Sequence, residues 1–229
     1  MKANSIRARV RAEMTDEIKE IARRHLATDG ANLSLRAVAR DLGMVSSAIY
    51  RYFPSRDDLL TALILDAYND LGGSAEKAVA SVPPEAPATR WLALAGAVRD
   101  WALARPHEYA LIYGSPVPGY QAPEDTVAAG TRAVTVAGAI LQGALMTGTL
   151  DLNDDPLPPP SSVADLERVQ AVIAPDVPLN VLARGLSAWV ALFGSVTFEI
   201  FGQLRNTINT PAEFFDHQMR AQARYIGLR

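Results

Sequence analysis

The sequence predicts an all-α protein with a helix-turn-helix domain at its N-terminus and a larger helical part after it. Apolar residues recur at helical spacing, Pro and Gly divide the chain into helix-sized segments, and no stretch alternates apolar with polar residues as a strand does. With 229 residues, 49% of them hydrophobic, the chain can bury a sizeable core. We expect an N-terminal domain over residues 1–60 and a C-terminal domain over residues 61–229.

The segment 34–60, SLRAVARDLGMVSSAIYRYFPSRDDLL, is the most informative part of the chain. Val38 and Leu42 recur at helical spacing, and Gly43 supplies the flexible residue that ends their helix. Ser46 is then expected to cap a second helix. Two short helices joined by a tight turn are a helix-turn-helix pattern, typical of proteins that read a DNA major groove.

The second of these helices is expected over Ser46 to Phe53. At about 100° per residue, Val45, Ile49 and Phe53 stack on one side and are predicted to face the core. The opposite side must then face solvent or a partner. Small residues, a phenol and a guanidinium on that side suit groove reading; they are Ser47, Ala48, Tyr50 and Arg51.

The next helix is predicted to begin with a capping-box-like pair, Ser55 and Asp58, directly after Pro54 has ended the previous helix. Arg56, in the first turn, is placed to reach a DNA phosphate.

Charge favours the same interpretation. Residues 1–56 hold eleven Lys and Arg against six Asp and Glu, although the whole chain has a net charge of −3. Four of these cations, Lys2, Arg7, Arg9 and Arg11, precede the first helix without an intervening acid. We expect them to form an arm that follows the phosphate backbone or enters a minor groove, with a solvated tail as the alternative.

The order LG, V, SS, IYRYF and PSRDDLL resembles the DNA-binding domain of the TetR/AcrR family of bacterial regulators over residues 8–60. The resemblance implies phosphate and groove contacts from Ser34 and Arg36 at the start of the second helix. It also implies contacts to the groove or the backbone from the residues that follow: Ser46, Ser47, Ala48, Tyr50, Arg51, Tyr52 and Arg56.

Beyond residue 60 the chain predicts further helices divided by Pro and Gly. They are expected near residues 56–80, 86–105, 107–114, 123–150, 162–174, 179–204 and 211–227. A linker is predicted at 82–87 and an extended loop at 151–160, DLNDDPLPPP. Thr210, Pro211 and Glu213 give the last helix a cap, a first-turn proline and a capping-box acid.

Two uncharged segments, 133–150 and 185–198, are predicted to be buried or to lie at a subunit interface and not to cross a membrane. The first is rich in small residues, and the second is too short to span a bilayer. The basic N-terminus is not followed by an apolar run, so we expect no signal peptide. The absence of cysteine is compatible with a reducing cytoplasm, where we expect the protein to act.

In the C-terminal part, WVALFG at 189–194 and RPHEYALIYGSPVPGYQAP at 105–123 resemble a TetR subgroup with a Trp-His-Gly signature. Phe193 stands where that subgroup has histidine, which removes a polar group. The resemblance implies a ligand cavity among large rings and donor groups. The residues expected to line it are Trp101, Tyr109, Tyr113, Met146, Trp189 and Phe193.

A homodimer is expected, with the last two long helices of each subunit forming a four-helix interface. One apolar stripe of the 179–204 helix and the apolar surface of the final helix are assigned to it. They comprise Gly185, Ala188, Leu192, Val196 and Ile200, with Phe214, Phe215, Met219 and Tyr225.

The sequence does not favour an enzyme. His25, His107 and His217 are far apart, and no HExxH, GxSxG, GxxxxGK[ST] or GxGxxG pattern is present. We expect no cofactor and no metal site. The predicted function is a repressor that binds double-stranded operator DNA and is released by a small apolar or amphipathic effector. The alternatives are a ligand-independent dimeric regulator, favoured by a filled core, and an enzyme fused to a DNA-binding domain.

Overall fold

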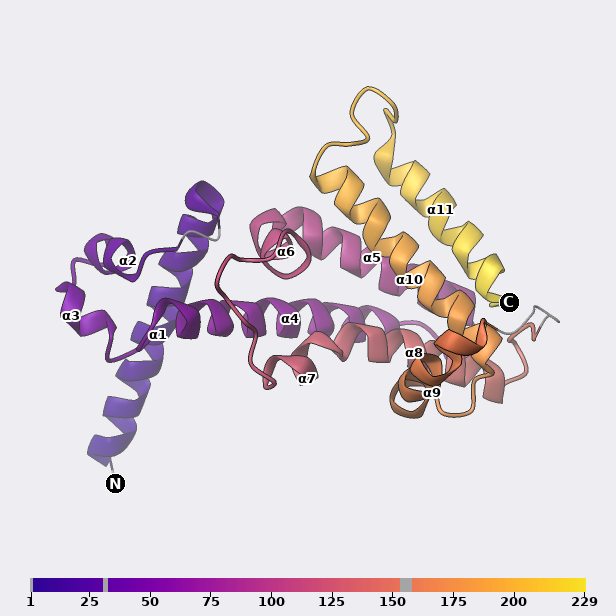
Figure 1. The fold of residues 1–229 in the computed structure, drawn as a ribbon, viewed down its shortest axis with the longest axis horizontal. Coiled ribbons are helices and arrows are strands. Elements are labelled where there is room, and N and C mark those ends of the chain that lie inside the picture. The colour runs from indigo at the N-terminus through magenta and orange to yellow at the C-terminus, as the bar shows by residue number, and fades with distance from the viewer. Residues whose placement is uncertain (1, 31–32, 153–157) are drawn as a thin grey trace. The chain divides into compact units, whose positions relative to one another are not determined.

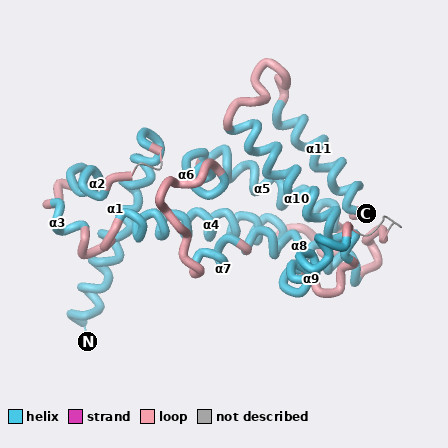
Figure 2. Tube along the Cα trace, in the orientation of Figure 1, coloured by secondary structure: helices cyan, strands magenta, loops and turns pink. Residues whose placement is uncertain are grey.

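The computed structural model describes residues 2–30, 33–152 and 158–229, and these fold into helices without a β-strand (Figures 1 and 2). The all-α prediction is therefore confirmed; a single isolated bridge joins Leu150 to Leu228. The helices are α1 (Lys2–Asp29), α2 (Leu35–Asp41), α3 (Ser46–Ile49), α4 (Arg56–Ala80), α5 (Pro87–Ala104), α6 (Pro106–Tyr113), α7 (Thr126–Gly130), α8 (Arg132–Met146), α9 (Pro160–Ile173), α10 (Leu179–Ile200) and α11 (Pro211–Ile226).

Two compact units divide the chain. The first unit contains Met1–Asn69 with Arg105–Gly130, and the second contains Asp70–Ala104 with Thr131–Arg229. The long helix α4 begins in the first unit and ends in the second. The boundary predicted at residue 60 separates a DNA-binding domain from the rest of the chain. The division into compact units does not test that boundary, so it stays a prediction.

The first unit packs α1 to α4 around one apolar core. Ile18, Val38, Ile49 and Leu59 come from these four helices and are each fully buried. Local signals fix the helix ends: Gly43 adopts a positive φ of 66° directly after α2, a conformation that glycine tolerates without strain. Two short helices are thereby held at a fixed turn against α1 and α4.

The capping box at the start of α4 is confirmed. The Asp58 amide donates to Ser55 Oγ at 3.1 Å, and the Ser55 hydroxyl donates to Asp58 Oδ2 at 2.7 Å. The predicted start of the last helix is also correct, since Thr210 is the N-cap residue of α11 and Pro211 occupies its first turn.

The second helix of the motif is shorter than predicted. α3 ends at Ile49, and residues 50–52 continue as turns. Ser46 is not the N-cap; Val45 holds that position in an extended conformation, with φ −65° and ψ 135°. A helical wheel does not apply to an extended residue, and this is why Val45 is 71% exposed although it was predicted to be buried. Ile49 and Phe53 are buried as predicted.

The basic N-terminal segment is helical and is not an arm that precedes the first helix. α1 begins at Lys2 and continues to Asp29. The physical reason is in the sequence, because residues 2–29 contain neither Gly nor Pro to interrupt a helix.

The second unit packs α5 against α8, α10 and α11. The Trp91 indole donates to the main-chain oxygen of Met219 at 3.1 Å, which joins α5 to α11. Arg99 and Glu199 join α5 to α10 through two hydrogen bonds of 2.8 and 2.6 Å. These largely buried polar contacts fix the relative positions of the three helices.

Three predicted helix boundaries need correction. The helix expected over 123–150 is divided at Thr131 into α7 and α8. α9 begins at Pro160, within the expected loop, because proline is tolerated in the first turn of a helix. Half of that loop, residues 153–157, lies outside the described residues. α10 ends at Ile200, four residues before the predicted end at 204.

Among the residues that the structure describes, α10 is long and apolar enough to cross a membrane by length and composition alone. It spans 22 residues with a mean hydropathy of 1.5 over its most apolar window. The uncharged segment 185–198, judged from the sequence to be too short to span a bilayer, is only part of this longer helix. A core helix of a soluble protein meets the same criterion.

Candidate nucleic-acid interface and interior pocket

The outward side of α3 and the following turn carries the residues expected to meet DNA. Ser46, Ser47 and Arg51 are exposed, and Tyr50 is 42% exposed. Ala48 is half-buried. The direction of this face is set by Ile49, which is fully buried. The face combines two hydroxyls, a phenol and a guanidinium, which are groups that bond to base edges and phosphates.

α2 supplies the second part of the interface. Ser34 is exposed and caps α2, with its Oγ accepting a hydrogen bond from the Ala37 amide at 3.4 Å. Arg36 is exposed in the first turn. At the other end of α2, Asp41 Oδ2 lies 2.7 Å from Nε2 of His25 on α1. This hydrogen bond lowers the pKa of Asp41 from its ordinary value, so the contact ties α2 to α1 with an ionised carboxylate.

One basic residue of α1 contacts the turn that follows α3. The Arg11 guanidinium donates to the main-chain oxygen of Arg51 at 2.8 Å and lies over the ring of half-buried Tyr52, 5.4 Å from its centre. Arg11 was expected in an arm along the DNA backbone or in a solvated tail, whereas the structure places it in α1, where it contacts the recognition element. Arg56 pairs with Asp57 at 3.5 Å in the first turn of α4.

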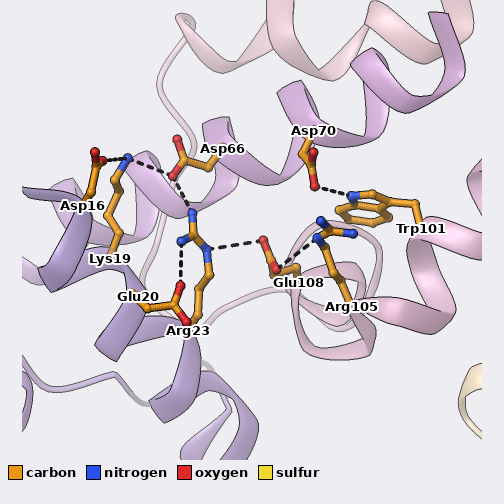
Figure 3. A network of polar contacts seen from close by, with 9 residues as sticks. All are labelled: Asp16, Lys19, Glu20, Arg23, Asp66, Asp70, Trp101, Arg105 and Glu108. Carbon is orange, nitrogen blue, oxygen red and sulfur yellow. Dashed lines mark hydrogen bonds and ion pairs between the residues drawn. The ribbon is translucent and has the colours of Figure 1, made fainter. Parts of the chain in front are cut away.

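A network of charges joins α1 to α4 and α6 within the first unit (Figure 3). Arg23 on α1 contacts Asp66 on α4 at 2.7 Å and Glu108 on α6 at 3.6 Å. Lys19 also contacts Asp66, at 3.0 Å. Ion pairs therefore attach α1, the helix that supports the recognition face, to α4 and α6.

The second unit contains a small apolar cavity of about 20 Å³ among α5, α8, α9, α10 and the end of α11. The Trp91 indole N–H beside it already donates to a main-chain oxygen, so the wall offers little polar chemistry. α9 and α8 approach closely here, since a Cβ built on Gly138 would lie 2.0 Å from Cγ2 of Ile173. The lining includes Trp91, Gly138, Leu141, Ile173, Gly185 and Trp189.

The structure brings only part of the predicted ligand set to this cavity. Trp189 lines it, and the Phe193 ring packs against Trp189 with 4.7 Å between ring centres. Trp101 is buried elsewhere in the same unit and donates to Asp70 at 2.9 Å (Figure 3). Met146 is 79% exposed and lies outside the lining.

The two remaining predicted ligand residues belong to the first unit. Tyr109 and Tyr113 pack with ring centres 5.2 Å apart, and Tyr68 meets Tyr113 edge-on at 6.1 Å. Burial raises the pKa of Tyr113, so its hydroxyl is protonated at neutral pH. These rings form an aromatic cluster within the first unit, and none of them is among the residues that line the Trp189 cavity.

Most of the predicted dimer stripe lies inside the protomer. Five of its members are 7% exposed or less: Ala188, Leu192, Val196, Phe215 and Met219. Gly185 lines the cavity, and Ile200 and Phe214 are half-buried. The stripe therefore supplies core packing. α10 is apolar on both sides, so the helical wheel alone could not select the buried one.

The opposite side of α10 is both apolar and exposed. Val190, Phe198 and Phe201 are 70%, 52% and 46% exposed, and Tyr225 on α11 is 50% exposed. A groove of about 270 Å³ lies between the two helices. It is lined by Ala191, Gly194, Ser195, Phe198, Leu204, Phe214 and Gln218. We refer to these residues with Val190, Phe201 and Tyr225 as the outer α10–α11 face.

Comparison with known proteins agrees with this architecture. Residues 18–63 match the model of the bacterial regulatory proteins of the tetR family, and residues 91–222 match the tetracyclin repressor-like C-terminal domain. The HTH-type transcriptional regulator Rv1816 of Mycobacterium tuberculosis is 40% identical over 213 residues, which cover 92% of this chain and 91% of that protein.

Solved structures give the same result. The putative regulatory protein SCO4313 is 33% identical with a TM-score of 0.75, and the match covers 94% of this chain and 97% of that one. A protein of unknown function from Rhodococcus sp. RHA1 is 25% identical with a TM-score of 0.68, covering 93% and 94%. These similarities, together with the helix-turn-helix geometry, show that the chain belongs to the TetR family of DNA-binding transcriptional regulators and is not an enzyme.

Proposed function

We propose that the protein is a cytoplasmic repressor that reads its operator with the exposed side of α3. The observation that carries this proposal is the combination of a buried Ile49 with exposed Tyr50 and Arg51 at the end of a short helix. The buried side chain fixes which side is presented, and the exposed groups bond to base edges and phosphates. Ser34 and Arg36 would add contacts from the start of α2.

A homodimer follows from the same proposal, because two recognition helices must enter major grooves about 34 Å apart on one face of the duplex. The outer α10–α11 face supports it. Its exposed rings form an apolar patch of the kind that subunit interfaces cover, and the groove between the helices can receive side chains of a symmetry mate.

The effector that releases the operator would be small, uncharged and apolar, and would bind at the Trp189 cavity. The cavity wall carries apolar side chains, which would leave a buried charge without compensation. A volume of about 20 Å³ holds roughly one water molecule, so an effector must separate α9 from α8 and α10. Effector binding would then select a conformation with altered recognition-helix spacing.

The small cavity also favours a second candidate, a dimeric regulator without an effector. Here the C-terminal unit would only dimerise, and the apolar core around Trp189 would be structural. The two candidates differ in one property, because only the first predicts that an apolar compound changes operator affinity.

The test is genome-wide capture of DNA bound to the protein in vivo, followed by titration of the enriched duplex and a screen of apolar compounds. Reporter transcription that rises when the gene is deleted supports a repressor. Transcription that falls would make the protein an activator, and failure to enrich any duplex would remove the proposal. Compounds that leave operator affinity unchanged across the screen would favour the effector-independent candidate.

A further inference from the structure

The N-terminal half of α1 extends well beyond the core of the first unit. Residues 6–13 are all exposed, and the first buried residue of the helix is Ile18. The matching family model begins at residue 18, so it assigns nothing to this extension. Figure 1 shows α1 continuing past α3 toward the N-terminus.

One contact fixes which side of the extension is turned toward the recognition element. Arg11 donates to the main-chain oxygen of Arg51 and lies over Tyr52. The side of α1 that carries Arg11 therefore faces the end of α3, beside the residues that meet the groove.

Arg7 lies one turn further along the same side. Residues four apart in a helix differ by about 40° in direction and by about 6 Å along the axis. Arg7 is exposed and lies one turn toward the N-terminus from the Arg11 contact, on the side of α1 that is turned toward the end of α3.

Arg9 lies on the other side of the same helix. It is two residues from Arg11, which turns it by about 200°, and it pairs with Glu13 at 3.5 Å. Its side chain is 72% exposed. Arg7 and Arg9 are thus exposed on opposite faces of the extension, and only the face of Arg7 is turned toward the recognition element.

We propose that Arg7 binds a phosphate of the operator backbone beside the groove that α3 enters. A helix with its side chains is about 10–12 Å wide and fills a major groove about 12 Å wide. Since a helix of this width fills the groove, a cation on an element beside it faces the sugar–phosphate backbone that borders the groove. The inference rests on operator binding by α3, and adds a positioning contact that carries no base specificity.

The experiment uses the full-length protein and a duplex enriched by in vitro selection with it. Dissociation constants are measured by fluorescence anisotropy over a series of salt concentrations for the parent, Arg7→Ala, Arg7→Lys and the matched control Arg9→Ala. Each lost phosphate contact lowers the slope of log affinity against log salt by about 0.9, so its loss from both subunits of the proposed dimer lowers the slope by about 1.8. Arg7→Ala should show this reduction and a severalfold weaker affinity, whereas Arg7→Lys keeps the slope and Arg9→Ala changes both far less.

Two results would overturn the inference. Arg7→Ala with the parent slope would show that no phosphate is bound, and equal losses in Arg7→Ala and Arg9→Ala would show an undirected effect of net charge. Circular dichroism on each variant checks that α1 remains helical. Arg51→Ala in the same titration separates this from the proposed function: if Arg51→Ala also binds as the parent does, the α3 face itself is not the site.

Discussion

Arg23 on α1 and Asp66 on α4 form an ion pair at 2.7 Å in which both side chains are about two thirds buried. α4 begins in the unit that carries the recognition face and ends in the unit that carries the apolar cavity. The pair joins α4 to α1, which packs against α2 of the helix-turn-helix within the first unit.

The first prediction concerns this attachment. Arg23→Ala should destabilise the protein by about 1–2 kcal/mol, because it leaves Asp66 and Glu108 partly buried with one cation fewer. Arg24→Ala removes the same charge from an exposed neighbour and should change stability by less than about 0.5 kcal/mol. Urea unfolding measures both, and equal midpoints for the two variants would show that the network contributes no more than a surface charge.

Replacing either of two adjacent glycines of α4 by alanine is predicted to change the stability of the protein in opposite directions. A Cβ on Gly72 would lie 2.7 Å from Cβ of Arg132, whose guanidinium is held by two hydrogen bonds to Glu76. Gly72→Ala should therefore cost about 1–3 kcal/mol. A Cβ on Gly73 would lie 3.9 Å from the nearest atom, an ordinary contact distance, so Gly73→Ala should stabilise the helix by up to about 1 kcal/mol. Thermal midpoints that rise in both variants would contradict the close packing of α4 on α8.

The outer α10–α11 face predicts how the dimer is disrupted. Phe198→Arg places a charge on this face, where the ring is 52% exposed, and should yield a folded monomer. Val196→Arg, two residues away, buries a charge in the protomer core and should prevent folding. Light scattering gives the mass of each soluble variant. A folded Phe198→Arg protein that remains dimeric would place the interface elsewhere.

An apolar effector should raise the melting temperature and quench tryptophan fluorescence while it releases DNA, because it stabilises the conformation that it binds. Trp189→Ala should abolish induction and leave operator binding intact. Met146→Ala, at a side chain that is 79% exposed, should leave induction unchanged. Loss of operator binding and induction together in Trp189→Ala would mean that the ring only supports the core.

The sequence predicted those features that depend on local chemistry. Gly43, the Ser55–Asp58 capping box and Pro211 mark helix ends through bonds within a few residues, and all three are where they were expected. The sequence also predicted that Ile49 and Phe53 are buried, because the apolar residues of this segment gather on one side.

Features that depend on packing between distant segments were not predicted. α10 is apolar all round, so its pattern does not show whether Val196 or Phe198 belongs to the core. Met146 was assigned to a cavity through the family resemblance of its helix, although α8 ends there and exposes it. The support that Arg11 gives to Arg51 joins residues forty positions apart, and no local pattern reports such a contact.

The most direct test of DNA recognition by α3 is a titration of the selected operator duplex at fixed salt with the parent, Tyr50→Phe and Arg51→Ala. Both side chains are on the exposed side set by Ile49, so the variants should fold as the parent does. Arg51→Ala should lose about 1–3 kcal/mol of binding free energy if it reads a base, and Tyr50→Phe should bind more weakly than the parent. Operator affinities equal to that of the parent in both variants would contradict the account.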